Sequence, residues 1–113
     1  MDFVNKLKEF MKFICKKYES NDTFRGYGEY SWPLIEESRI DFGDARAQLA
    51  AMDILLNQGL IEIVGKKSTR SIKITDRIRP TFKGLNTKRQ DWSNIISAVT
   101  EGITKGIIGG FKH

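Results

Sequence analysis

Apolar residues recur at three- and four-residue steps near the start of the chain, and this spacing predicts an amphipathic helix over Asp2–Glu19. Asp2 is placed to cap its first turn. The predicted buried stripe consists of Phe3, Leu7, Phe10, Ile14 and Tyr18. We therefore expect one face of this helix to belong to the core.

A second helix is predicted over Asp41–Gln58, with Asp41 as its cap and Gly59 as its stop. The predicted inward side holds Phe42, Ala45, Leu49, Met52 and Leu56. The predicted outward line holds Arg46, Ala50, Asp53 and Asn57, with Ala47 beside it. Few side chains of this surface are suited to base edges, and the negative charge of Asp53 would repel a polyanion such as DNA.

The segments around the second helix predict shorter elements. Thr23–Ser31 is expected to be a loop that leads into an extended piece, and Trp32–Pro33 opens a short helix because proline suits the first helical position. Leu60–Val64 and Ser71–Thr75 are predicted strands, joined by a polar loop into a β-hairpin.

The chain after the hairpin is predicted to be a loop with a short helical turn over residues 76–86, followed by a C-terminal amphipathic helix. Thr87–Gln90 has the capping-box pattern that starts a helix, and Trp92 begins its apolar face. We divide the chain into residues 1–86 and a C-terminal helix over 87–113. Both Trp32 and Trp92 are expected to be core anchors.

Charge divides the 113 residues unevenly. The net charge is +5, but residues 21–60 hold three basic and seven acidic groups, and residues 61–113 hold eleven basic and four acidic groups. An anionic partner should therefore meet the C-terminal half, and nucleic acid is one such partner.

Little in the chain indicates catalysis. One cysteine (Cys15) and one histidine (His113) leave no internal disulfide, no metal-ligand spacing and no nucleophile–histidine arrangement. We expect a cytoplasmic protein that is not an enzyme and needs no cofactor or metal.

The order short helix, turn, longer helix ending in glycine, then strand–loop–strand, with the junction Leu55–Ile61 (LLNQGLI), resembles the winged-helix superfamily. This resemblance implies an α+β fold in which Pro33–Ser38 and Asp44–Gln58 form a helix-turn-helix and Lys66–Arg70 forms the wing tip. With its Trp92-started final helix, the chain also resembles small, often prophage-associated YjcQ-like proteins.

Two functional hypotheses follow. The first is a nucleic-acid-binding, regulatory protein that contacts double-stranded DNA through a basic wing. Its candidate residues are Arg46, Asn57, Lys66, Lys67, Ser68, Thr69, Arg70, Lys73, Arg77 and Arg79. Cationic tips can contact phosphates, but they also occur as solvated turns that keep strand edges from aggregating.

The second hypothesis is a protein-interaction or homodimerisation module, which could be phage-derived. Glycines four apart allow close helix approach, and the second helix offers small residues. Its candidate residues are Ala47, Ala50, Gly102, Ile103, Gly106, Ile107 and Gly110. The glycine-spaced tail could instead pack on its own core. Contact with a membrane surface is the weaker interpretation, because few basic residues lie near this segment.

Overall fold

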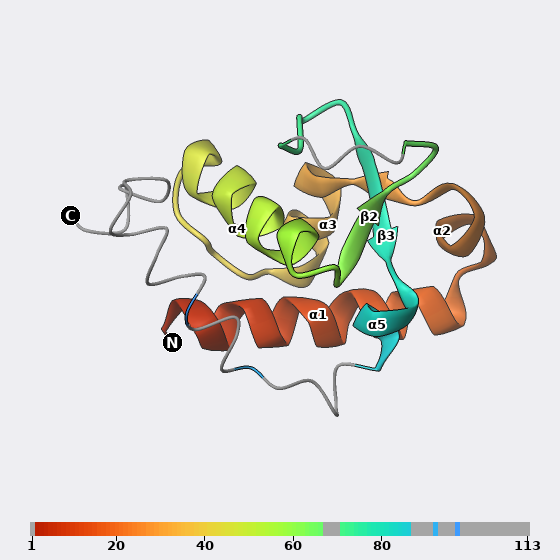
Figure 1. Cartoon of the computed structure of the whole chain (residues 1–113), viewed down its shortest axis with the longest axis horizontal. Helices are drawn as coiled ribbons and strands as arrows, with labels where there is room; N and C mark the ends of the chain where they lie inside the picture. The colour runs from red at the N-terminus through yellow and green to blue at the C-terminus, as the bar shows by residue number, and fades with distance from the viewer. Residues whose placement is uncertain (1, 67–70, 87–91, 93–96, 98–113) are drawn as a thin grey trace.

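The computed structural model describes residues 2–66, 71–86, 92 and 97. Across these residues the chain is α+β, with five helices and one three-stranded antiparallel sheet (Figure 1). The elements are α1 (Phe3–Ser20), α2 (Asp22–Tyr27), β1 (Glu29–Tyr30), α3 (Ser31–Ser38), α4 (Ala45–Asn57), β2 (Ile61–Ile63), β3 (Arg77–Pro80) and α5 (Phe82–Leu85). This order is compatible with the expected winged-helix layout.

Helix α1 confirms the first predicted helix. Asp2 caps it, because its carboxylate accepts a hydrogen bond from the Asn5 backbone N–H at 2.8 Å. Four residues of the apolar stripe and its flank are fully buried: Leu7, Phe10, Met11 and Ile14. Full burial of such side chains stabilises a fold by about 1.5–3 kcal/mol each.

Helix α2 was not predicted, and it occupies most of the segment expected to be a loop. Asn21 starts it by accepting a hydrogen bond from the Phe24 N–H at 2.9 Å, and the Phe24 side chain is buried. A capping side chain and one apolar anchor are thus enough to make six residues helical when the tertiary structure supplies a place for that anchor.

Helices α3 and α4 confirm the two predicted central helices, with one change of cap. Asp44, not Asp41, caps α4 and accepts from the Ala47 N–H at 2.9 Å. Asp41 instead accepts from the Gly43 N–H in the turn before it, at 2.8 Å. Gly59 stops α4 with φ of 74°, as predicted.

The sheet has the order β1-β3-β2, so β3 is the central strand. Strand β2 confirms the prediction for Leu60–Val64. The predicted strand Ser71–Thr75 is wrong, because the partner of β2 is β3, which pairs Ile63 with Ile78. Alternation around Ile72 and Ile74 suggested a half-buried strand, but Ile74 is 65% exposed in a connecting loop.

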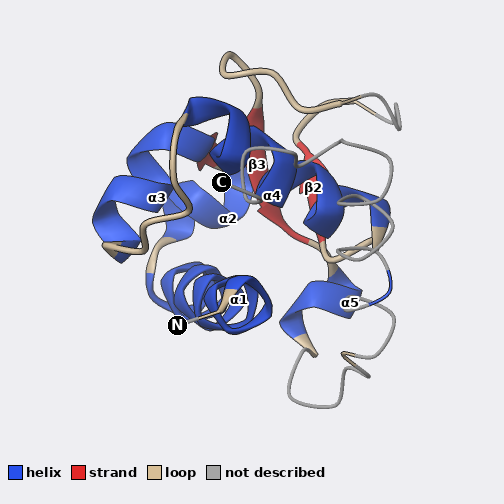
Figure 2. Ribbon diagram, turned by 90° about the vertical axis from the view of Figure 1, so that its left-hand side faces the viewer, coloured by secondary structure: helices blue, strands red, loops and turns tan. Residues whose placement is uncertain are grey.

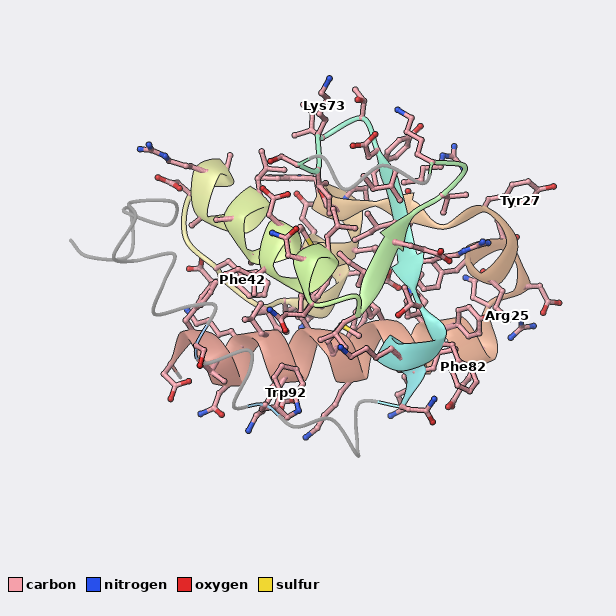
Figure 3. The ribbon with its side chains drawn as sticks, in the orientation of Figure 1. Arg25, Tyr27, Phe42, Lys73, Phe82 and Trp92 are labelled. Carbon is pink, nitrogen blue, oxygen red and sulfur yellow. The ribbon has the colours of Figure 1, made fainter. Side chains whose placement is uncertain are left out.

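One core joins the helices to the sheet. In Figure 1, α1 runs along the lower side of the molecule with α5 against it, and α4 and the sheet lie above. The end-on view of α1 in Figure 2 shows α3 and α4 on the opposite side of the core. Phe42 fills the space between α1 and α4, with its ring 5.8 Å from that of Phe10 (Figure 3).

The predicted C-terminal helix lies outside the described residues, apart from Trp92 and Ser97. Trp92 is half-buried against the core, with the Lys8 ammonium 5.6 Å from its ring centre. The other tryptophan differs from the prediction, because Trp32 is 48% exposed. Among the described residues, no helix combines the length and apolar character needed to cross a bilayer.

Candidate nucleic-acid interface

The outer face of α4 carries Arg46 and Asn57, and both are exposed as predicted. The prediction that Ala47 and Ala50 lie on this face is wrong, since each is only 5% exposed. They therefore offer no free surface to a partner.

The error is one of helical phase. The buried side of α4 holds Ala47, Ala50, Ala51, Met52, Ile54 and Leu55. We expected Ala45, Leu49 and Leu56 to face the core, yet Ala45 is exposed and both leucines are only half-buried. Alanines let α4 approach its neighbours closely, and the bulkier leucines cover the edges of the contact.

The wing is longer than predicted, since residues 64–76 connect β2 to β3. It begins with a bond from the Val64 N–H to the Arg77 carbonyl at 2.8 Å, which extends the strand pairing by one step. Bonds from Lys66 N–H to Ile63 and from Asp76 N–H to Lys73 then close local turns. Lys73 projects from the described part of this loop at the top of the molecule (Figure 3).

Two carboxylates organise this loop. Asp53 on α4 accepts from the Ile72 N–H at 2.6 Å, and Asp76 accepts from the Lys73 N–H at 2.8 Å. Asp76 is 4% exposed and also lies 3.5 Å from the Lys66 ammonium. Both carboxylates thus accept hydrogen bonds from the wing. Asp53 is therefore a weaker source of repulsion toward a polyanion than its place on α4 alone indicates.

Burial affects Asp53 more than its hydrogen bonds do. Desolvation raises the pKa of the Asp53 carboxyl, while the hydrogen bonds with the Ile72 backbone and the Ser71 side chain lower it by less. The carboxylate is therefore held in a place where its charge is disfavoured.

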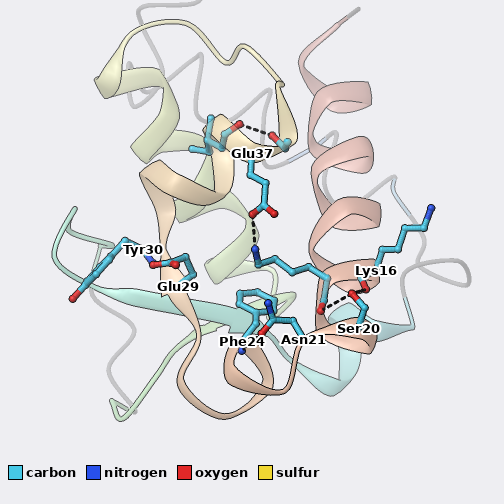
Figure 4. Close-up of polar contacts among 10 residues, drawn as sticks. Lys16, Ser20, Asn21, Phe24, Glu29, Tyr30 and Glu37 are labelled. Atoms are coloured by element: carbon cyan, nitrogen blue, oxygen red, sulfur yellow. Dashed lines mark hydrogen bonds and ion pairs between the residues drawn. The ribbon is translucent and has the colours of Figure 1, made fainter.

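Three described cations surround the wing: Lys66, Lys73 and Arg77, all exposed. The Arg77 guanidinium lies 4.9 Å from the ring centre of Tyr30, its partner in the pairing of β1 with β3. Hydrogen bonding with Tyr30 raises the pKa of Arg77, so this group remains cationic. Figure 4 shows Tyr30 pointing outward on one side of the molecule and Lys16 on the other.

Arg79, another predicted nucleic-acid contact, is held by hydrogen bonds within the fold. Its guanidinium donates to Glu62 at 2.9 Å and to the backbone carbonyls of Arg25 and Gly26 at 2.9 and 3.1 Å. It ties the sheet to the end of α2, and its contact with a nucleic acid stays a prediction.

The remaining candidates lie outside the described residues. These are Lys67, Ser68, Thr69 and Arg70 of the wing tip and Gly102, Ile103, Gly106, Ile107 and Gly110 of the tail. In the described ranges, no group of three His, Cys, Asp or Glu side chains could hold a metal ion.

The sequence did not predict the inward roles of Asp53 and Asp76 or the pairing of Tyr30 with Arg77. The contacts of Asp53 and of Tyr30 join residues distant in the sequence, so periodicity carries no sign of them. Asp76 lies between an apolar alternation and the next strand, where carboxylates often close turns. This position was the sequence signal for its inward role. Searches with protein-family profiles, among curated proteins and among solved structures found no match to this chain.

Proposed function

We propose that this chain is a winged-helix protein that binds double-stranded DNA, with α3 and α4 as a helix-turn-helix and residues 64–76 as the wing. The sequence α3, α4, β2, β3 is the layout that the resemblance implies, and β3 pairs with both β1 and β2 in support of it. The proposed role is regulatory and non-enzymatic.

One observation carries the proposal: a cationic wing is attached to the exposed face of α4. Arg46, Asp53 and Asn57 are seven and four residues apart, so they share one side of the helix. The hydrogen bond from Ile72 to Asp53 brings the wing to that side. Residues 66–77 hold five basic side chains and one acidic side chain, and that acid is buried.

The mechanism is mainly phosphate neutralisation. Lys66, Lys73 and Arg77 are exposed, although the Lys66 ammonium also lies 3.5 Å from Asp76. Long cationic side chains of this kind release counterions from DNA on binding. Base contacts are few, because Arg46 and Asn57 are the exposed polar residues of α4 suited to base edges. We therefore propose modest sequence preference.

Paired lysine substitutions test this proposal. Lys66→Ala with Lys73→Ala should weaken binding of the full chain to a mixed-sequence duplex by about tenfold at low salt and reduce the salt slope by about two. The matched control is Lys12→Ala with Lys16→Ala, two exposed lysines of α1. Figure 4 shows Lys16 directed away from the Tyr30 side. Equal effects of the two pairs, measured by fluorescence anisotropy, would contradict the proposal.

A protein-interaction function is the alternative, and exposed aromatic residues favour it. Tyr27, Trp32 and Phe82 are 66%, 48% and 84% exposed, and aromatic side chains are enriched in protein interfaces. Light scattering across concentration, on the full chain and on a chain ending near Gln90, tests self-association. A constant monomer mass in both would remove the tail as a dimerisation element.

A further inference from the structure

The contact between Asp53 and the wing loop joins residues nineteen positions apart. The Asp53 carboxylate accepts from the Ile72 N–H at 2.6 Å, and it also hydrogen-bonds with the Ser71 side chain. The Ile72 side chain is 4% exposed and belongs to the core cluster. Hydrogen bonds to Asp53 and burial of the Ile72 side chain thus both hold residues 71 and 72 in place.

Besides the Asp53 bond, the buried Ile72 side chain holds the described part of the wing to the core. The bonds from Lys66 N–H to Ile63 and from Asp76 N–H to Lys73 close turns inside the wing, and neither reaches the helix. Without the Asp53 bond, the polar parts of the loop on either side of Ile72 could adopt more orientations, which would separate its lysines from the face of α4.

Asp53 makes its hydrogen bonds to the wing from a half-buried position. Its half-buried position disfavours the charged carboxylate by more than the two hydrogen bonds favour it. What the side chain supplies to the wing is the hydrogen bond that holds the Ile72 backbone at 2.6 Å.

We propose that Asp53 is a positioning residue that fixes the wing relative to α4, so that the wing cations and Arg46 engage one DNA duplex together. This inference rests on the proposed function. It predicts that loss of the Asp53 side chain weakens DNA binding. Electrostatics alone predicts the opposite, because removing a carboxylate near DNA should strengthen binding.

Two substitutions separate position from charge. Asp53→Ala removes both the charge and the acceptor, so it should weaken duplex binding by about fivefold, the effect of losing one net hydrogen bond from the oriented state. Asp53→Asn removes the charge but keeps a carbonyl oxygen that can accept from Ile72, so it should bind DNA more tightly than the wild type. Glu19→Ala removes an exposed carboxylate at the end of α1 and should remain within about twofold of the wild type. Equally tightened binding by Asp53→Ala and Asp53→Asn would overturn the proposal.

Amide exchange of Ile72 in the free full-length protein gives a readout that needs no DNA. Asp53→Ala should speed this exchange by at least about tenfold, and Asp53→Asn should restore most of the protection. An unchanged rate of Ile72 amide exchange in Asp53→Ala, with circular dichroism showing a folded protein, would contradict the proposal that the Asp53–Ile72 hydrogen bond holds the wing. Failure of the wild type to bind any duplex would instead overturn the proposed function, and the Ile72 rates would then decide the role of this hydrogen bond separately.

Discussion

At the scale of single residues, cations that look equivalent in the sequence have different surroundings. Lys66, Lys73 and Arg77 are exposed around the wing, whereas Arg79 is only two positions further and is held by one carboxylate and two backbone carbonyls. Alternation along β3 separates Arg77 from Ile78, but it places Arg77 and Arg79 on the same face, and only the contacts distinguish them.

Replacement of Arg79 by lysine tests this distinction. Arg79→Lys keeps the charge but loses the planar fork that reaches Glu62 and the end of α2 together, so it should lower the free energy of unfolding by about 1–2 kcal/mol. Urea denaturation measures this change. We expect the salt slope of DNA binding to be unaltered, and a reduced slope with unchanged stability would contradict the structural role of Arg79.

The raised pKa of Asp53 has a definite effect on stability against pH. Between the ordinary aspartate pKa and the raised folded pKa, the native state binds more protons than the unfolded state, so the contribution of Asp53 to stability falls as pH rises through that interval. Asp53→Asn lacks this titration. The unfolding free energy of the wild type minus that of Asp53→Asn should therefore decrease from about pH 3 to about pH 7. A difference that increases with pH in urea melts would show that the carboxylate is stabilised by folding.

At the scale of elements, periodicity located α1 and α4, the Trp32–Pro33 pair located α3, and a short apolar run located β2. Periodicity misplaced the second wing strand, since Ile72 and Ile74 alternate like a strand but belong to a loop anchored from α4. It also placed Ala47 and Ala50 among the exposed residues of α4, although the burial of an alanine depends on how closely the neighbouring elements approach. Distant contacts decided each of these points.

The packing of α5 shows such a close approach. A Cβ at Gly84 would lie 2.0 Å from the Leu60 carbonyl oxygen, which is backbone at the start of the wing strands. Gly84→Ala should therefore destabilise the protein by about 2–3 kcal/mol by forcing α5 away from the core.

Gly26 in α2 provides the matched control, because a Cβ there would meet nothing within 4 Å. Gly26→Ala should leave stability unchanged or raise it by about 0.5–1 kcal/mol. Thermal melts of both variants check the pair. Equal melting temperatures for Gly84→Ala and the wild type would show that α5 does not pack as described.

At the scale of the whole molecule, the net charge of +5 is the sum of an acidic middle and a basic C-terminal half. Asp53 and Asp76 hydrogen-bond to the backbone of the wing, and Arg79 hydrogen-bonds to Glu62 in the sheet. Lys66, Lys73 and Arg77 are exposed. The proposed DNA-binding face is therefore more positive than the sequence of α4 alone suggested.

The salt dependence of duplex binding by the full chain tests the central claim most directly. Up to five wing cations contacting phosphates predict that log Kd rises linearly with log salt, with a slope of about 3–5. No binding at low salt, or binding that is insensitive to salt, would contradict a DNA-binding wing.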